Sequence, residues 1–203
     1  MAEIPKKTAL YDFHIANSNN VVDFSGFYLP VFYSSIIDEH RAVRDKAALF
    51  DVSHMGQLIV TGHLSEKFVQ AVTINDISKL NPGQAQYSAI CDETGGIIDD
   101  VIVYKRKSDY MIVVNASDIE EKYQWLKSVL IEDANIENRS NEFSMIAIQG
   151  PLSREIIQAN IQIDISELKF YNFIENIDFL GFKILLSRTG YTGELGFEIY
   201  CSD

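Results

Sequence analysis

Three strand-like runs follow one another closely between residues 87 and 116, and they limit the possible folds more than any other feature. The runs are YSAIC (87–91), IIDDVIVYK (97–105) and YMIVVNA (110–116), all rich in β-branched and aromatic residues. Lys107, Ser108 and Asp109 suit the turn of a hairpin between the last two. The pattern indicates a sheet built mainly from antiparallel neighbours.

The second run contains two aspartates, although strands usually avoid this residue. Successive side chains of a strand point to opposite faces, so Asp99 shares one face with Val101 and Val103. Asp100 shares the other face with Ile102 and Tyr104. If both faces are covered, at least one carboxylate must be paired, neutralised or functional. The simpler interpretation is an exposed strand end after the glycine pair, with both carboxylates in water or capping backbone.

The remaining pattern combines strands with helices and predicts an α+β fold with mostly antiparallel sheets and flanking helices. We expect helices over 34–50, 64–72 and 151–160, and one opened by the capping box Ser117-Asp118-Ile119-Glu120 with its apolar stripe at Ile119, Tyr123, Leu126 and Leu130. Further strands are expected over 57–62, 143–150, 182–188 and 195–200. The chain has no low-complexity linker, so a second domain is expected as an insertion.

Charge and composition exclude several classes of protein. The 203 residues contain 17 basic and 29 acidic side chains, a net charge of −12, which argues against a nucleic-acid or anionic-membrane surface. No run has the length of a membrane span, and the first residues show neither a signal-peptide nor a transit-peptide pattern. We therefore expect a cytoplasmic protein, or one of the mitochondrial matrix in a eukaryote. A disulfide between Cys91 and Cys201 stays open, as does the oligomeric state.

Two shorter motifs invite functional interpretations that the residues do not favour. DVSHMG (51–56) holds Asp, Ser and His, but members of a catalytic triad converge through the fold and rarely adjoin in sequence. A helix exit with Asp51 or Ser53 bonded to nearby backbone is the simpler interpretation. The four histidines lack the spacing of metal ligands, so no metal is expected.

SRTGYTGELGFEI (187–199) has glycines at 190, 193 and 196, followed by a strand and not by the helix that phosphate binding requires. We expect a bent hairpin that presents Tyr191, Glu194 and Glu198. Glu198 alternates with Phe197 and Ile199, which by itself is more typical of a solvated carboxylate.

Several stretches in order resemble one family: VDFSGFYLPVFY, IIDEHRAVRDKAALFDVSHMG, QYSAICDETGGIIDDVIVYK, VVNAS, IAIQGP and SRTGYTGELGFEI. Through nearly all of its length the chain is similar to the N-terminal portion of the T-protein, the aminomethyltransferase of the glycine cleavage system. The resemblance implies a folate-binding T-protein fold with an inserted ferredoxin-like subdomain. It places the first domain at 1–53 and 141–203 and the inserted α+β subdomain at 54–140, with the family's C-terminal part absent.

The resemblance also implies a reaction and a site. The T-protein takes the aminomethyl group from the lipoyl arm of H-protein, transfers the one-carbon unit to tetrahydrofolate and releases ammonia. Asp100 matches the family's catalytic carboxylate beside the folate. Carried over likewise, the folate contacts are Met55, Tyr87, Asp100, Ile102, Tyr104, Val113, Asn115, Tyr191 and Glu198.

The chemistry of these residues suits a folate. A pterin presents an amino group and a ring N–H side by side, a donor pair for one carboxylate, and Glu198 is the candidate. Tyr87, Tyr104 and Tyr191 could wall the aromatic ligand. Asp100 would orient the folate amine and accept or stabilise its proton. Asp99 is then the structural member of the pair.

The sequence departs from the family at Phe27, where tryptophan is common, and at Phe170, where a folate-contact tyrosine can occur. The family's later arginine-bearing segment has no counterpart here, so we expect a fragment of a longer protein. Two alternatives stay open, a non-catalytic folate-binding module and a truncated remnant without transferase activity.

Overall fold

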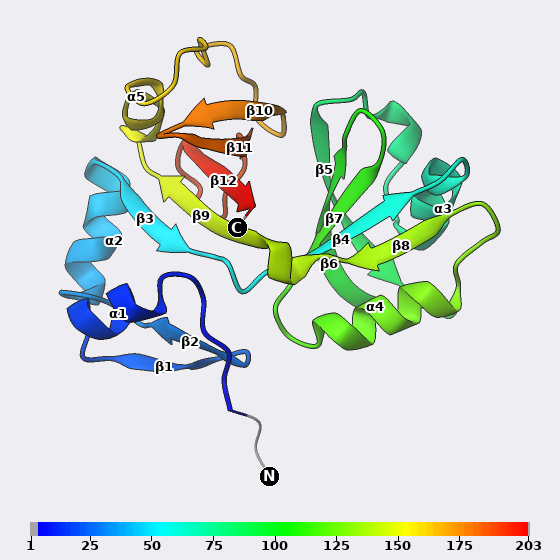
Figure 1. The fold of residues 1–203 in the computed structure, drawn as a ribbon, viewed down its shortest axis with the longest axis horizontal. Coiled ribbons are helices and arrows are strands. Elements are labelled where there is room, and N and C mark those ends of the chain that lie inside the picture. The colour runs from blue at the N-terminus through cyan, green and yellow to red at the C-terminus, as the bar shows by residue number, and fades with distance from the viewer. Residues whose placement is uncertain (1–3, 203) are drawn as a thin grey trace. The chain divides into compact units, whose positions relative to one another are not determined.

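The computed structural model describes residues 4–202 and divides into two compact units. Unit 1 comprises Met1–His54 and Phe143–Asp203, and unit 2 comprises Met55–Glu142. Unit 2 is therefore inserted in the sequence between the two parts of unit 1. Each unit has its own five-stranded antiparallel sheet (Figure 1). The predicted α+β class with mostly antiparallel sheets is confirmed.

Unit 2 contains a ferredoxin-like arrangement with one additional strand. Its elements are β4 (Gly56–Thr61), α3 (Ser65–Val72), the 3₁₀ turn η1 (Ile77–Lys79), β5 (Gln84–Cys91), β6 (Ile97–Lys105), β7 (Tyr110–Val114), α4 (Ile119–Ser128), β8 (Asn135–Asn138) and the 3₁₀ turn η2 (Ser140–Glu142). The sheet order is β5-β6-β7-β4-β8. Without β5, this is the order of the split βαβ motif found in ferredoxin-like folds.

One face of this sheet carries the core of unit 2. Val101 and Val103 of β6 join Leu58, Ile112 and residues of α3 and α4 in one buried cluster. Both helices therefore cover the same face, as Figure 1 shows for unit 2. The apolar stripe predicted for α4 is confirmed, because its four residues all pack in or against this cluster.

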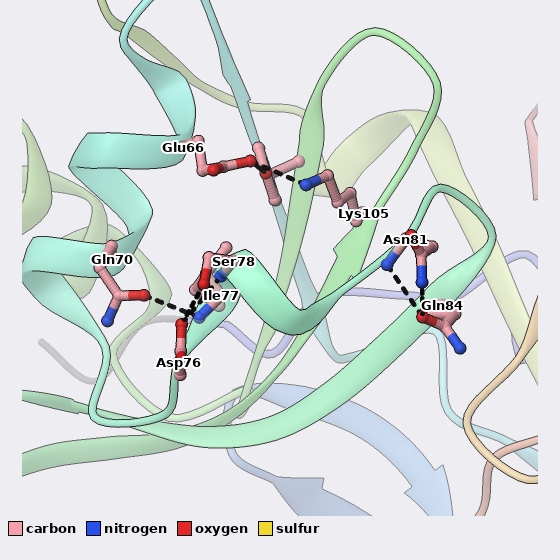
Figure 2. A network of polar contacts seen from close by, with 9 residues as sticks. Glu66, Gln70, Asp76, Ile77, Ser78, Asn81, Gln84 and Lys105 are labelled. Carbon is pink, nitrogen blue, oxygen red and sulfur yellow. Dashed lines mark hydrogen bonds and ion pairs between the residues drawn. The ribbon is translucent and has the colours of Figure 1, made fainter.

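A polar network anchors α3 to the far end of β6, away from the aspartate pair. Figure 2 shows Glu66 of α3 beside Lys105 of β6, whose Nζ donates to Glu66 Oε2 at 2.7 Å. The Tyr110 hydroxyl donates to the same oxygen at 2.6 Å. Burial, and then the hydrogen bond to Glu66, raise the pKa of Tyr110 to about 12. In the same view, Gln70 of α3 accepts a hydrogen bond from the Ile77 backbone, which fixes η1 against the helix.

Unit 1 is built on the sheet β10-β11-β12-β9-β3. Its elements are α1 (Tyr11–Asn17), β1 (Val21–Phe24), β2 (Phe27–Pro30), α2 (Ile36–Asp45), β3 (Ala48–Asp51), β9 (Phe143–Gln149), α5 (Ser153–Gln158), β10 (Phe173–Phe179), β11 (Phe182–Ser187) and β12 (Gly196–Ser202). Strands β1 and β2 form a separate hairpin. Ile157 of α5 packs in the core with Ile148, Phe197 and Ile199 of the sheet.

Two expectations about helices are wrong. The helix expected over 34–50 ends at Asp45, and Ala48–Asp51 forms edge strand β3, in which Phe50 pairs with Ala147 of β9. Pairing with a distant strand outweighs the local helical pattern there. The predicted capping box of α4 does not form. The N-cap is Asp118 and not Ser117, which places Glu120 at the second helical position where a capping box needs the third. Asp118 has a left-handed φ of 55°, and within the described residues 4–202 its side chain makes no capping hydrogen bond.

Within the described part of the chain, no helix is both long and apolar enough to cross a membrane. The same residues include no disulfide between Cys91 of β5 and Cys201 of β12.

Candidate functional site

Four side chains form a row across the sheet of unit 2, on the face opposite α3 and α4. The strand register places Tyr87 of β5 beside Ile102 of β6, Ile102 beside Val113 of β7, and Val113 beside Gln57 of β4. Directly paired residues of neighbouring strands share a face. Asp100 and Tyr104 lie two positions from Ile102 and therefore share it too. The register thus brings together five of the residues predicted for the site.

Asp100 is exposed, and two donors orient its carboxylate. The Tyr87 hydroxyl donates to Oδ2 at 3.0 Å, and Asn115 Nδ2 donates to Oδ1 at 2.9 Å. Asn115 follows β7 directly, so its side chain reaches the start of β6. Tyr87 is itself 49% exposed. A carboxylate held between two donors, yet open to solvent, can receive a proton from a bound molecule.

Asp99 has the opposite environment. Its side chain is only 9% exposed and pairs with Lys122 of α4, with Nζ 2.8 Å from Oδ2. Asn115 donates to it twice, from its backbone N–H at 3.0 Å and from Nδ2 at 2.8 Å. The interpretation of both aspartates as a solvated strand end is therefore wrong for Asp99. These contacts agree with the expected scaffold role of Asp99, and the expected folate role of Asp100 stays a prediction.

The other predicted contacts of unit 2 differ in accessibility. Tyr104 is completely buried, and Val113 nearly so, whereas Ile102 is partly exposed. Met55 lies directly before β4, where its carbonyl accepts a hydrogen bond from Gln57 Nε2 at 3.0 Å. Among residues 4–202, the buried Oε1 of Gln57 has no hydrogen-bond partner. Sequence reasoning missed Gln57, which places an unsatisfied acceptor in the same row.

The remaining two predicted residues belong to unit 1. Tyr191 is 98% exposed in the loop between β11 and β12. Glu198 of β12 is only 9% exposed and accepts a hydrogen bond from Thr189 Oγ1, so the interpretation as a solvated carboxylate is wrong. Burial, followed by the negative charge of Glu198, raises the pKa of Tyr171. Tyr171 is therefore a neighbour of Glu198 that sequence reasoning missed.

The glycine spacing in 187–199 has a packing cause. A Cβ atom at Gly190 or at Gly196 would lie 2.1 Å from Oε1 of the buried Gln149. Gln149 Nε2 donates to the carbonyls of Thr189 and Phe197, both at 3.3 Å. Arg44 of α2 also holds the loop, with its Nη1 2.8 Å from Glu194 Oε1. These contacts form the expected bent hairpin and leave Tyr191 projecting.

Asp51 and Ser53 of the DVSHMG stretch belong to a buried network in unit 1 and not to a helix exit. Asp51 belongs to β3, and its Oδ1 accepts from the Ser53 N–H at 3.0 Å, as expected for local backbone bonding. Its Oδ2 contacts His14 Nε2 at 2.8 Å and Thr8 Oγ1 at 2.7 Å. Burial raises the pKa of Asp51, but the hydrogen bonds from Ser53, Thr8 and His14 outweigh it and lower the pKa overall.

His54 follows this network and is surrounded by aromatic rings. Its ring centroid lies 5.4 Å from that of Phe24 and 6.4 Å from that of Phe27. Burial lowers the pKa of His54, although the Asp51 charge opposes the shift. Within residues 4–202 its buried Nδ1 has no hydrogen-bond partner. The folded protein therefore favours the neutral imidazole.

We predict that His54→Phe reduces the loss of stability on mild acidification. The folded pKa is lower than the unfolded value near 6.5, so the unfolded chain takes up the proton first as pH falls below that value. The wild type should therefore lose stability as the pH falls through about 6.5 towards the lowered folded pKa, and part of this loss should vanish in the variant. Urea unfolding at several pH values measures how steeply the free energy of unfolding changes with pH in the wild type and in His54→Phe. Identical slopes would contradict the prediction.

Within the described residues 4–202, no group of three or more His, Cys, Asp or Glu side chains is arranged to hold a metal ion.

The fold matches that of a known class of protein. Over 96% of the chain, the structure is similar to glycine cleavage system aminomethyltransferase T from Bartonella henselae, with a TM-score of 0.84 and 28% identity, and it covers 53% of that chain. A chain of the heterotetrameric sarcosine oxidase from Corynebacterium sp. U-96 shares only the fold, with a TM-score of 0.57, 15% identity and 82% of each chain covered. The protein thus has the T-protein fold.

The sequence comparison identifies the family. Residues 10–203 match the GCVT N-terminal domain, and the chain belongs to this family. Aminomethyltransferases from Halalkalibacterium halodurans and Bacillus mycoides are 45% and 50% identical over 197 residues, which is 97% of this chain and 54% of each relative. The chain spans about half the length of the curated relatives it matches.

Proposed function

We propose that this chain forms the folate-binding N-terminal portion of an aminomethyltransferase of the glycine cleavage system. The observation that supports this most strongly is the accessible Asp100 carboxylate, held by Tyr87 and Asn115 in a family whose curated relatives are named aminomethyltransferases. The acceptor of the one-carbon unit is tetrahydrofolate. The donor is the lipoylated H-protein.

Asp100 acts on the folate amine. In the overall reaction, the carbon leaves its sulfur and its amino nitrogen and becomes bonded to two folate nitrogens. The two folate N–H protons end on the lipoyl sulfur and on the released ammonia. A carboxylate beside the attacking amine can orient it and accept or stabilise its proton. Tyr87 and Asn115 keep Asp100 oriented for this role.

Glu198 is proposed to take the pterin edge. Two neighbouring N–H donors on the ligand match the two oxygens of one carboxylate, and burial strengthens such charge-assisted hydrogen bonds. Tyr87 and Tyr191 supply exposed aromatic surface for the ligand. Met55, Ile102, Tyr104, Val113 and Asn115 complete the proposed folate contacts. A cytoplasmic location is part of the same proposal.

A calorimetric titration of the chain with 5-formyltetrahydrofolate, a stable reduced folate, tests the binding proposal. Circular dichroism first establishes that each protein is folded. Losing even one hydrogen bond to a charged group, worth about 1.5–3 kcal/mol, should weaken binding by at least about 10- to 150-fold in Glu198→Ala. The matched control is Glu167→Ala, which removes an exposed carboxylate of the same unit and should leave the Kd unchanged.

Absence of binding by the folded wild-type chain would overturn the proposal for these 203 residues. Binding without ammonia release from an aminomethyl-loaded lipoyl protein would favour the alternative, a non-catalytic folate-binding module. The length relative to the curated relatives is the observation that keeps this alternative in view.

A further inference from the structure

We propose that the buried Asp99–Lys122 pair positions Asn115, and through Asn115 the carboxylate of Asp100. This inference rests on the proposed function of Asp100 and assigns two positioning residues to it. Neither was among the predicted site residues. The argument depends on contacts within unit 2 only.

Asn115 lies at the centre of the arrangement, because its side-chain nitrogen has two hydrogens and both aspartates accept from it. Nδ2 lies 2.8 Å from Asp99 Oδ1 and 2.9 Å from Asp100 Oδ1. An amide that bridges two carboxylates on opposite faces of one strand has little rotational freedom. Its orientation therefore decides where Asp100 Oδ1 lies.

Lys122 holds this bridge from α4. Its Nζ donates to the Asn115 carbonyl at 3.0 Å, to the Ser117 carbonyl, and to Asp99 Oδ2 at 2.8 Å. These contacts tie the β7–α4 connection, at Asn115 and Ser117, to Asp99 of β6.

Burial makes the pair an unusual choice if its only role is stability. The Lys122 and Asp99 side chains are 7% and 9% exposed. Desolvation offsets most of the attraction in such a pair, and replacing both partners by apolar residues is often neutral for stability. What an apolar pair cannot supply is the acceptor for Asn115. The geometry therefore points to positioning.

Two double variants isolate this role. Asp99→Leu with Lys122→Met removes both charges and the acceptor, while Asp99→Asn with Lys122→Met removes both charges but retains an acceptor oxygen for Asn115. We expect the first to lower kcat for ammonia release about 10- to 100-fold, because a displacement of about 1 Å at a catalytic group has effects of this size. The second should retain much of the wild-type kcat.

Asn115→Ala adds a test that keeps the ion pair intact. If the pair acts through Asn115, combining Asn115→Ala with Asp99→Leu and Lys122→Met should lower kcat no further than Asn115→Ala alone. Additive losses would overturn the proposal. A wild-type kcat in the folded double variant Asp99→Leu with Lys122→Met would also overturn it. If that double variant does not fold, the proposal is tested with Asp99→Asn plus Lys122→Met and with Asn115→Ala. An unchanged kcat in Asn115→Ala overturns the proposal.

A spectroscopic measurement separates this inference from the proposed function. The side-chain amide signals of Asn115 in a ¹H–¹⁵N spectrum should shift towards those of a solvated amide when Asp99→Leu is combined with Lys122→Met. They should shift much less when Asp99→Asn is combined with Lys122→Met. Unchanged signals in the first double variant would overturn the positioning role. A wild-type protein that releases no ammonia contradicts the transferase proposal, whereas the amide signals still test the bridge.

Discussion

Replacing Asp100 by asparagine should lower turnover about 100- to 10,000-fold, the range for losing a general base, while folate binding changes little. The amide has the shape of the carboxylate. Its oxygen can still accept from Asn115 Nδ2 while its NH2 group donates to the Tyr87 hydroxyl oxygen, so the row of ligand-facing residues stays in place. It cannot accept a proton or balance the positive charge that develops on the folate amine. Asp100 is exposed, and the variant should therefore fold as the wild type does.

The measurement is ammonia release with aminomethyl-loaded lipoyl protein and tetrahydrofolate, paired with calorimetric binding of 5-formyltetrahydrofolate. Glu93→Gln is the matched control, because Glu93 is an exposed carboxylate in the turn between β5 and β6. It should turn over like the wild type. Unchanged turnover in Asp100→Asn would show that the catalytic assignment is wrong, and a large loss of binding would make Asp100 mainly a binding residue.

Lys122→Met should destabilise unit 2 by about 3–5 kcal/mol, since it leaves the Asp99 carboxylate buried without its cationic partner. The side chain also supplies hydrogen bonds to the carbonyls of Asn115 and Ser117, and methionine cannot replace them. Methionine fills similar space, so the loss reports on charge and hydrogen bonding more than on packing. We expect the Asp99→Leu substitution to restore most of this stability in the double variant.

Urea unfolding followed by fluorescence suits this prediction, because the single tryptophan of the chain, Trp125, lies in α4 three residues from Lys122. The control is Lys127→Met in the same helix. Lys127 is exposed, and its Nζ lies 5.7 Å from the centroid of the Tyr123 ring, a contact worth about 0.5–1 kcal/mol. Similar losses in the two variants would mean that burial of the Asp99–Lys122 pair has no energetic consequence.

Local patterns were enough to predict much of the fold. The alternation of side chains along 97–105 separates Asp99 from Asp100, and the register places Asp100, Ile102 and Tyr104 on one face. The strands of unit 2 from β4 to β7, the helices α3 and α4, and the hairpin of β11 and β12 lie close to their expected positions. Strand β8, strand β10 and the N-terminal elements α1, β1 and β2 carried too weak a periodicity to be predicted.

The site was less predictable, because its decisive contacts join residues far apart in sequence. Lys122 lies beside the apolar stripe of α4 by its spacing, but lysine is a residue type that is mostly exposed, and only the approach of α4 to the start of β6 explains its burial against Asp99. Glu198 becomes buried where Thr189 reaches its carboxylate, and Gln149 accounts for glycines some forty residues later in the chain.

The sequence by itself determined the strand alternation, the antiparallel class and the family resemblance, since each depends on residues close in the chain or on their order. Only the tertiary structure decided that Ala48–Asp51 is a strand, that Asp99 pairs with Lys122, and that Asn115 bridges the two aspartates. The physical reason is that side-chain periodicity arises from local backbone geometry, whereas burial and partner choice depend on which distant segments fold against one another.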